Sequence, residues 1–297
     1  MLLHCCSLDA HKEPETQAVQ EIFLPHCFFI LFKGGFPVIN HLTNYYEHYD
    51  EDARLLSRPG QTEFLTTMRY ISRYLFPAAR VLEIGAGTGR YSRHIASLGY
   101  RVDAVELIPH NIDVFKAHID KAHPVSVHQG NALHLHMFQD KLFDVTLLLG
   151  PLYHLMTQKE QLQALREAVR VTRPGGVIMA AYCMADSAIL QHGFIRGNIH
   201  TLIENKLLDP RTFRASSRPE DIIALHRVED IEYLRAQLPV QMLHLAATDG
   251  YAHHMRERLE EMDADTFDLF LQYHFSSCER RELLGYSNHA LDIFKRL

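Results

Sequence analysis

"VLEIGAGTGRYSRH", residues 81–94, decides the fold, because an apolar run leads directly into a glycine cluster and then into a helical pattern. Gly85, Gly87 and Gly89 stand at alternating positions in that cluster. A loop without side chains lets a ligand approach the main chain closely, beside the N-terminus of a helix. The stretch therefore predicts a buried strand, a ligand-binding loop and a helix, in that order.

Strand and helix patterns alternate around this loop. Strands are expected at 80–84, 101–107, 125–131, 143–150 and 176–183, and helices at 61–76, 88–99, 109–120 and from the capping box Thr157 to Glu160 up to a turn at 173–176. In the first helix an apolar face is expected to hold Phe64, Leu65, Met68, Ile71 and Leu75. Alternation of this kind predicts a parallel sheet with right-handed crossovers.

The C-terminal third breaks the alternation. Residues 184–238 mix helix and loop, and two further strands are expected at 240–250 and 289–297. We therefore expect an α/β fold with a doubly wound, mostly parallel seven-stranded sheet and a helical lid insertion between strands 5 and 6. Ligands in open α/β folds bind at the carboxyl ends of the strands, and the lid is expected to cover that edge.

The first 37 residues differ in texture from the rest. Their apolar run at 22–32 is too short to span a bilayer, and the acidic residues before it are unlike a signal peptide. The segment "KGGFPV", 33–38, can be encoded by a ribosome-binding sequence followed by a GTG start codon at Val38. We expect 1–37 to be an N-terminal extension, either disordered or the result of a mis-called start, and 38–297 to be the functional domain.

Composition narrows the class of protein. The chain is 47% hydrophobic and 22% charged, as in ordinary globular proteins, and its net charge of −6 disfavours a nucleic-acid partner. Its five cysteines have no CxxC spacing, so neither a disulfide framework nor a zinc site is indicated, and a reducing cytoplasmic location is expected. The 21 histidines include no HExxH, and His134 and His136 lack a local third ligand, so no metal is expected.

The glycine loop does not fit the common nucleotide motifs. Arg90 stands where the dinucleotide fingerprint requires its third glycine, and no P-loop lysine follows. Glu106 ends the second strand, where an acid can accept hydrogen bonds from both ribose hydroxyls of an adenosine. Glu83 adds a second negative charge near the loop, and Asn131 places an amide near an adenine edge. Two acids disfavour a pyrophosphate and suit a ligand that combines adenosine with an ammonium and a sulfonium.

Five segments together resemble the class I, Rossmann-like S-adenosylmethionine-dependent methyltransferases in order and spacing: "VLEIGAGTGRYS", "VDAVEL", "QGNA", "FDVTLLLGPLYHL" and "RPGGVIMAAYC". The resemblance covers about residues 60–183 and implies S-adenosylmethionine as the methyl donor. It implies that the loop packs under the methionine part, that Glu106 binds ribose, and that Leu149 lies near the carboxypropyl group. The expected cofactor-binding residues are Glu83, Gly85, Ala86, Gly87, Gly89, Glu106, Leu107, Asn131, Ala132 and Leu149.

Candidate catalytic residues follow the fourth strand, in Gly150-Pro151-Leu152-Tyr153-His154. Gly150 stands where methyltransferases of amide or exocyclic amino nitrogens often carry Asn or Asp, so methylation of DNA bases or of glutamine is disfavoured. His154 is a candidate general base, and it can equally cap the next helix or lie in solvent. Tyr153 is expected to form a wall of the pocket.

Four aromatic residues precede the core: Tyr45, Tyr46, His48 and Tyr49. They are expected either to line the ligand site or to pack as a helix face on the sheet. The leading functional hypothesis is methylation of a small molecule. An RNA or protein methyltransferase and a non-enzymatic S-adenosylmethionine-binding protein are the alternatives, and a dehydrogenase is disfavoured by the missing third glycine.

Overall fold

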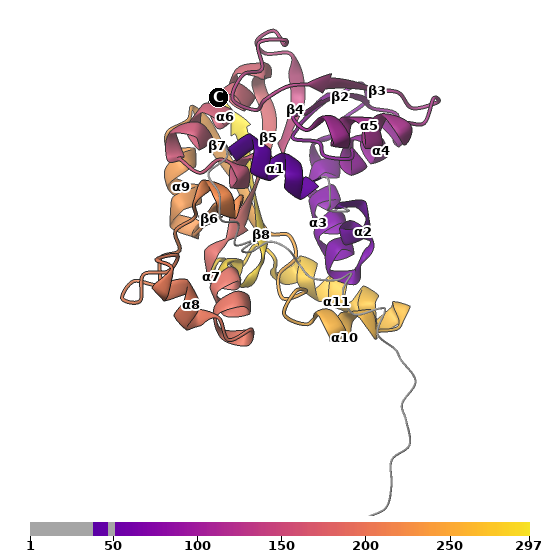
Figure 1. Cartoon of the computed structure of the whole chain (residues 1–297). Helices are drawn as coiled ribbons and strands as arrows, with labels where there is room; N and C mark the ends of the chain where they lie inside the picture. Colours follow the sequence, from indigo (N-terminus) through magenta and orange to yellow (C-terminus); the bar gives the residue numbers. More distant parts are fainter. Residues whose placement is uncertain (1–37, 47–50) are drawn as a thin grey trace, which may run out of the picture.

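The computed structural model describes residues 38–46 and 51–297, with the side chains of 38–40, 51–53 and Pro219 excepted (Figure 1). The expectations for 1–37, and those for His48 and Tyr49, lie outside the described residues. In the part that the structure describes, no helix combines the length and apolar character needed to cross a membrane.

One sheet organises the part of the chain that the structure describes. Its strand order is β3-β2-β1-β4-β5-β8-β7, and the short β6 pairs with β5 outside that path. The strands are β1 (Arg80–Ile84), β2 (Arg101–Glu106), β3 (Val125–Gln129), β4 (Phe143–Leu148), β5 (Thr172–Met184), β6 (Leu225–His226), β7 (Val240–Ala247) and β8 (His289–Arg296). Among the strands of the described residues, only β8 runs antiparallel to its neighbours, β5 and β7. The seven predicted strands are confirmed, and β6 is a two-residue addition.

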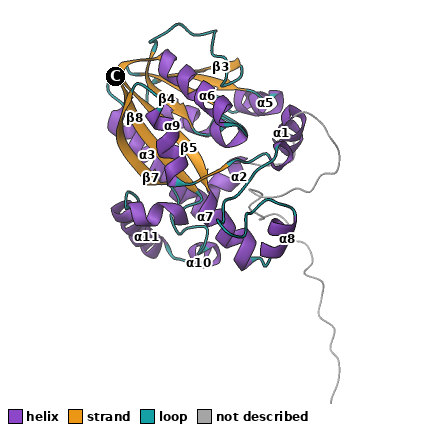
Figure 2. Cartoon of the chain, turned by 90° about the vertical axis from the view of Figure 1, so that its left-hand side faces the viewer, coloured by secondary structure: helices purple, strands orange, loops and turns teal. Residues whose placement is uncertain are grey.

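Helices cover both faces of this sheet (Figure 2). The strand order reverses at β1, so right-handed crossovers put α4 and α5 on one face and α6 on the other. The N-terminal helices are α1 (Val38–Tyr46), α2 (Glu51–Leu56) and α3 (Arg58–Tyr74), and the crossover helices are α4 (Arg90–Ser97), α5 (Pro109–Ala117) and α6 (Gln158–Val171). This doubly wound arrangement explains why β1 and β4 are almost entirely buried: helices cover both of their faces.

The apolar face expected for the first helix is partly wrong. Leu65 is 39% exposed, whereas Thr62 and Thr66 are buried in α3. Each of these threonine hydroxyls donates to the carbonyl four residues earlier, at 3.0 Å for Thr62 and 2.7 Å for Thr66. Because the hydroxyls are satisfied within the helix, threonine can be buried in place of leucine, and the helix is rotated from the orientation that apolar periodicity predicts.

The turn expected at 173–176 is a bulge within β5. Phe143 of β4 pairs with Thr172, but Val145 pairs with Val177, so the residues between Thr172 and Val177 outnumber those opposite them. The extra residues leave the ladder and return to it, which keeps both ends of β5 in one strand.

The segment 184–238 contains α7 (Ala185–Ala188), a π-helix (Ile189–Ile195), α8 (Ile199–Glu204), a 3₁₀ turn η3 (Pro219–Asp221), β6 and α9 (Val228–Ala236). It contacts the core through Ala224, whose N–H donates to the carbonyl of Tyr153 at 2.7 Å. Its action as a lid stays a prediction.

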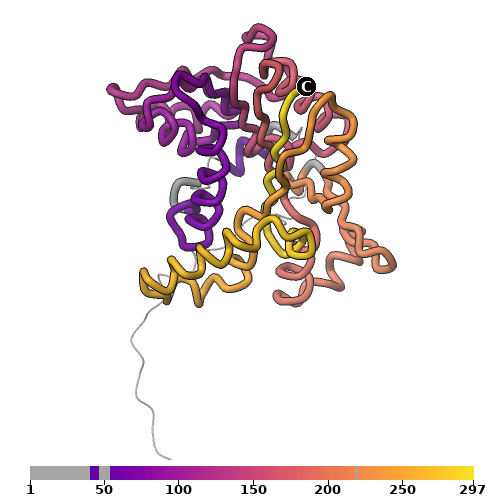
Figure 3. Tube along the Cα trace, turned by 180° about the vertical axis from the view of Figure 1, so that it is seen from behind, coloured from indigo at the N-terminus to yellow at the C-terminus, as the bar shows by residue number. Residues whose placement is uncertain are grey.

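The C-terminal helices pack against the N-terminal ones. Between β7 and β8 lie α10 (Arg256–Glu260), α11 (Ala264–Ser277) and the 3₁₀ helix η4 (Arg281–Tyr286). Figure 3 shows α10 and α11 beside α2 and α3. The backbone N–H of Arg58 donates to Glu260 at 2.9 Å, and its guanidinium lies 4.3 Å from the ring centre of Phe267. The two ends of the domain therefore stabilise each other.

The capping box at the start of α6 is present as expected. The hydroxyl of Thr157 accepts from the N–H of Glu160 at 3.2 Å, and the Glu160 carboxylate accepts from the N–H of Thr157 at 3.2 Å. Two N–H groups that have no partner inside the helix are satisfied in this way.

Thr157→Ala removes this cap and is expected to lower the free energy of unfolding by about 1 kcal/mol. Urea denaturation measures the change, and Thr157→Ser, which keeps the hydroxyl, is the control. Equal losses in both variants would contradict the assignment of the cap.

Candidate functional site

A cavity of about 360 Å³ opens at the carboxyl ends of β1, β2, β3 and β4. This is the place where the strand order reverses and where open α/β sheets bind ligands. Its walls are the loops after these four strands and one side of α1. The lining residues are Leu42, Tyr46, Gly85, Gly87, Glu106, Leu107, Ile108, Asn111, Gly130, Asn131, Ala132, Leu133, Gly150, Pro151, His154, Leu155, Met156, Thr157 and Glu160.

The glycine loop divides into a packed and an open part. A Cβ on Gly89 would lie 2.2 Å from the ring of Phe115, so this glycine allows α5 to pack closely on the loop. A Cβ on Gly87 would meet no atom within 4 Å, and Gly87 lines the cavity. Both have positive φ, 82° and 55°, a conformation that favours glycine. Gly87 is therefore the glycine that leaves room for a ligand.

Glu106 stands in the wall of the cavity and is already hydrogen-bonded to the main chain. One carboxylate oxygen accepts from the N–H of Gly87 at 2.8 Å, and the other from Ile108 N at 2.9 Å and the Asn111 amide at 3.4 Å. Burial raises the pKa of Glu106, and these hydrogen bonds oppose the rise. A carboxylate has about four lone-pair positions, and three are in use. Two ribose hydroxyls can therefore bind together only if one internal bond is released.

Glu83 does not face the cavity, contrary to the expectation that its charge reaches the ligand. Its side chain is buried, and one carboxylate oxygen accepts from the backbone N–H of Ser92, at 2.9 Å, and from the Ser92 hydroxyl. Burial raises the pKa of Glu83 to about 7, against the effect of the Ser92 hydrogen bonds. Glu83 therefore ties β1 to the first turn of α4, behind the glycine loop.

Some of the other expected cofactor-binding residues line the cavity, and others do not. Leu107, Asn131 and Ala132 line the cavity. The Asn131 side-chain carbonyl accepts from Leu133 N at 2.9 Å, so the amide NH₂ is the group that Asn131 can offer to a ligand. Ala86, Gly89 and Leu149 are not among the lining residues.

Tyr153 also lies outside the lining. Its hydroxyl donates to the carbonyl of Leu149 at 3.1 Å, and its ring centre lies 4.8 Å from that of His154. Tyr153 therefore supports His154 from behind.

His154 reaches the cavity in a defined tautomer. Its Nδ1 lies 2.8 Å from the carbonyl of Ile222, which can only accept, so Nδ1 carries the proton. Nε2 is then an acceptor, and the hydroxyl of Tyr46 on α1 donates to it at 2.8 Å. Burial lowers the pKa of His154 to about 4. The ring is thus neutral near pH 7 and presents a lone pair, but it is a weaker base than an ordinary histidine. Its catalytic role stays a prediction.

Several lining residues were not expected from the sequence. Ile108 and Asn111 stand two and five residues after Glu106, and Pro151 lies in the segment after the fourth strand that was searched for catalytic residues, so their nearness to strand ends could have indicated them. Leu42 and Met156 carry no such signal, because they reach the cavity only through the packing of α1 and the loop before α6.

Comparison with known proteins identifies the domain around this cavity. Residues 82–180 match the family model described as a methyltransferase domain. A ubiquinone biosynthesis O-methyltransferase from Methylocella silvestris is 30% identical over 127 residues, which are 43% of this chain and 48% of that enzyme. An uncharacterized methyltransferase from Mycobacterium tuberculosis is 28% identical over 183 residues, 60% of this chain and 68% of that protein. The chain thus spans about half the length of the Methylocella relative.

Solved structures share the fold. A SAM-dependent methyltransferase from Methanosarcina mazei superimposes with a TM-score of 0.52 at 18% identity, over 77% of this chain and 97% of that one. A protein from Pyrococcus horikoshii gives a TM-score of 0.54 at 16% identity, over 86% of this chain and 99% of that one.

Substitution of Gly87 is expected to impair mainly ligand binding, and substitution of Gly89 mainly stability. Gly87→Ala is expected to lower affinity for S-adenosylhomocysteine at least about tenfold and to cost about 1–2 kcal/mol of stability, the strain of a positive φ. Gly89→Ala adds a clash with Phe115 and is expected to destabilise the fold by clearly more. Calorimetric titration and urea denaturation of both variants measure the two effects. Unchanged affinity in Gly87→Ala would contradict the assignment of the open position.

Nuclear magnetic resonance of ¹⁵N-labelled imidazoles tests the state of His154. A folded-state pKa near 4 means that the ring stays neutral, with its proton on Nδ1, as pH falls from 8 to about 5, and gains charge only below that range. His154→Gln assigns the signal. A midpoint near 6.5, as in an exposed histidine, would show that the ring is not held as described.

Proposed function

This chain belongs to the class I S-adenosylmethionine-dependent methyltransferases, and we propose that it transfers the methyl group of S-adenosylmethionine to a small-molecule acceptor. The observation that carries the proposal is that Glu106, hydrogen-bonded to Gly87, lines the same cavity as Tyr46 and His154. Glu106 offers an acid for ribose, and Tyr46 and His154 offer a hydrogen-bonding pair for an acceptor.

Glu106, Gly87 and Asn131 support the binding of the donor. Glu106 can exchange its bond to the Gly87 N–H for a ribose hydroxyl, and a carboxylate acceptor makes such bonds strong. The Asn131 amide lies within the same lining, and Gly87 leaves the space that the methionine part needs. Glu83 takes no direct part in this assignment, because its carboxylate is bound to Ser92.

The reaction is an in-line displacement. A lone pair of the acceptor attacks the methyl carbon, the carbon–sulfur bond breaks, and its electron pair stays on sulfur to give S-adenosylhomocysteine. The main contribution of the enzyme is alignment, which can supply on the order of 7–11 kcal/mol. If the acceptor is a hydroxyl, His154 Nε2 can accept its proton or orient it, once the Tyr46 hydroxyl is displaced.

A small acceptor agrees with several features. Leu42, Leu155 and Met156 give the cavity an apolar part near His154, and α1 closes one side. The net charge of −6 disfavours a nucleic-acid acceptor. The Methylocella relative is named for O-methylation in ubiquinone biosynthesis, which favours oxygen as the acceptor atom here. The alternatives are an RNA or protein acceptor and binding without catalysis.

Calorimetric titration with S-adenosylmethionine and S-adenosylhomocysteine tests the donor site. Glu106→Gln keeps the shape and removes the charge, so binding is expected to weaken by about 1.5–3 kcal/mol, about 10- to 150-fold. Asp113→Asn, an exposed acid on α5, is the control and is expected to bind normally. Circular dichroism of each variant checks the fold. Absent binding by the folded wild-type chain, or a preference for NAD, would contradict the proposal.

The acceptor class is tested with donor labelled in the methyl group. Label transferred to hydroxylated small molecules, and not to bulk RNA or protein, is the expected result. Label found mainly in RNA or protein would replace the small-molecule assignment. Tight donor binding without transfer to any class would favour the non-enzymatic alternative.

A further inference from the structure

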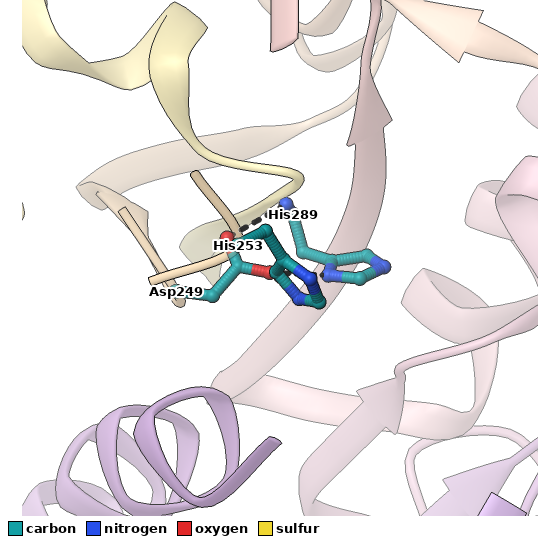
Figure 4. A group of neighbouring side chains, drawn as sticks. All are labelled: Asp249, His253 and His289. Atoms are coloured by element: carbon teal, nitrogen blue, oxygen red, sulfur yellow. Dashed lines mark hydrogen bonds and ion pairs between the residues drawn. The ribbon is translucent and has the colours of Figure 1, made fainter. Parts of the chain in front are cut away.

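A second group of polar side chains lies outside the cavity, at the junction of β7 and β8 (Figure 4). Asp249 follows the end of β7, His253 lies in the turn before α10, and His289 is the first residue of β8. His289 pairs with Cys183 near the carboxyl end of β5, so the group lies at the same edge of the sheet as the cavity. Its three members are not among the residues that line the cavity.

Asp249 is held so that one oxygen is used and the other faces the histidines. Its Oδ1 accepts from the backbone N–H groups of Asn288 at 2.8 Å and His289 at 3.2 Å, and from the Ser287 hydroxyl. Its Oδ2 lies 2.7 Å from Nδ1 of His289 and 3.3 Å from Nε2 of His253. One oxygen therefore fixes the carboxylate in place, and the other can serve a ligand.

The group is buried and incompletely satisfied. The side chains of Asp249, His253 and His289 are 0%, 5% and 9% exposed. Among the described residues, no group meets hydrogen-bond geometry with Nε2 of His253, although Oδ2 of Asp249 is near. An unsatisfied buried nitrogen is costly, and native proteins commonly explain one by an ion or a water molecule.

We propose that Asp249, His253 and His289 bind one divalent transition-metal ion, with zinc the expected ion. Their three ligand atoms lie within 4.8 Å of one another. Two imidazole nitrogens and a carboxylate oxygen are a ligand set that zinc and its neighbouring metals use. At zinc bond lengths of about 2.0–2.1 Å, tetrahedral ligand atoms lie about 3.3 Å apart. Asp249 Oδ2 and His253 Nε2 have this separation. Nδ1 of His253 accepts from Arg256 at 3.2 Å, so metal binding must release this bond and move the ring proton from Nε2 to Nδ1. Nδ1 of His289 must lose its proton and move back by about 0.6 Å.

Glu63, from a distant part of the chain, lies beside the group but is held by Arg54. Its Oε2 lies 3.6 Å from Nδ1 of His289, and Arg54 donates to both carboxylate oxygens, at 2.5 Å to Oε2 and 3.2 Å to Oε1. The three proposed ligands therefore leave the fourth position of the ion to a water molecule.

The competing occupant of the site is a proton. If His289 is protonated, it forms a buried ion pair with Asp249, and the charges of Glu63 and Arg54 cancel separately. Metal binding requires both imidazoles to be neutral. A chain in which His289 is held protonated is therefore expected to take up no metal, whereas a chain with both imidazoles neutral is expected to bind it.

Metal binding is measured on the full chain, free of any histidine tag and treated with a chelator. We expect one Zn²⁺ per chain by elemental analysis after titration and gel filtration, with a higher melting temperature. Co²⁺ in the same site is expected to give the visible absorption of a low-symmetry, four-coordinate ion. These readouts do not involve S-adenosylmethionine, so they stand apart from the test of the proposed function.

Variants place the ion. His253→Ala removes the ligand that lies in a turn outside the sheet, and it is expected to weaken Zn²⁺ binding at least 100-fold. His254→Ala is the matched control, because its ring bonds instead to the carbonyl of Tyr286 at 2.9 Å, and it is expected to bind normally. Asp249→Asn is the second ligand variant, and cooperative unfolding of each variant shows that it folds. A folded wild-type chain that takes up no stoichiometric metal, or equal binding by His253→Ala, would overturn the proposal and favour the ion pair.

Discussion

The reversal of strand order between β1 and β4 is the constraint on which the rest of the molecule depends. Because the crossovers on the two sides of β1 lie on opposite faces, the loops after β1 and β4 diverge and leave space between them. The cavity occupies this space. These loops still touch at their bases, where Gly85 lies against Pro151, and Gly89 lies against Phe115 of α5. The open volume is thus a consequence of topology, and the glycines determine where it reaches the main chain.

In this cavity, the Gly87 N–H and the ribose of a ligand compete for the carboxylate of Glu106. It holds the glycine loop through Gly87 N, and it is the acid placed to hold ribose. Burial already raises its pKa, so a ligand that donates hydrogen bonds stabilises the charged form as well as filling the cavity. Binding of S-adenosylmethionine is therefore expected to loosen the loop at Gly87 while it supplies hydrogen bonds to the Glu106 carboxylate. In the lining of the same cavity, the Tyr46 hydroxyl donates to the lone pair of His154 until an acceptor replaces it.

The sequence was most informative where local pattern and global fold agree. Strand, glycine loop and helix in 81–94, and the acid at the end of the second strand, follow from periodicity and spacing. Glu83 was wrongly expected to act on the ligand, because the glycine loop follows it closely in sequence. Its hydrogen-bond partner is Ser92, in the first turn of α4 beyond that loop. Leu65 was misplaced because buried threonines do not show in an apolar pattern. The tautomer of His154 depends on the carbonyl of Ile222, and Asp249, His253 and His289 meet only when β7 and β8 pair. Contacts of this range leave no local signal.

The most direct measurement of the central claim is a crystal structure of the chain with S-adenosylhomocysteine. We expect the ligand in the cavity, with both ribose hydroxyls within hydrogen-bond distance of Glu106, the bond from Gly87 N released, and the adenine beside Asn131. A ligand bound elsewhere, or one in the cavity with Glu106 still bound to Gly87 and away from the ribose, would contradict this claim.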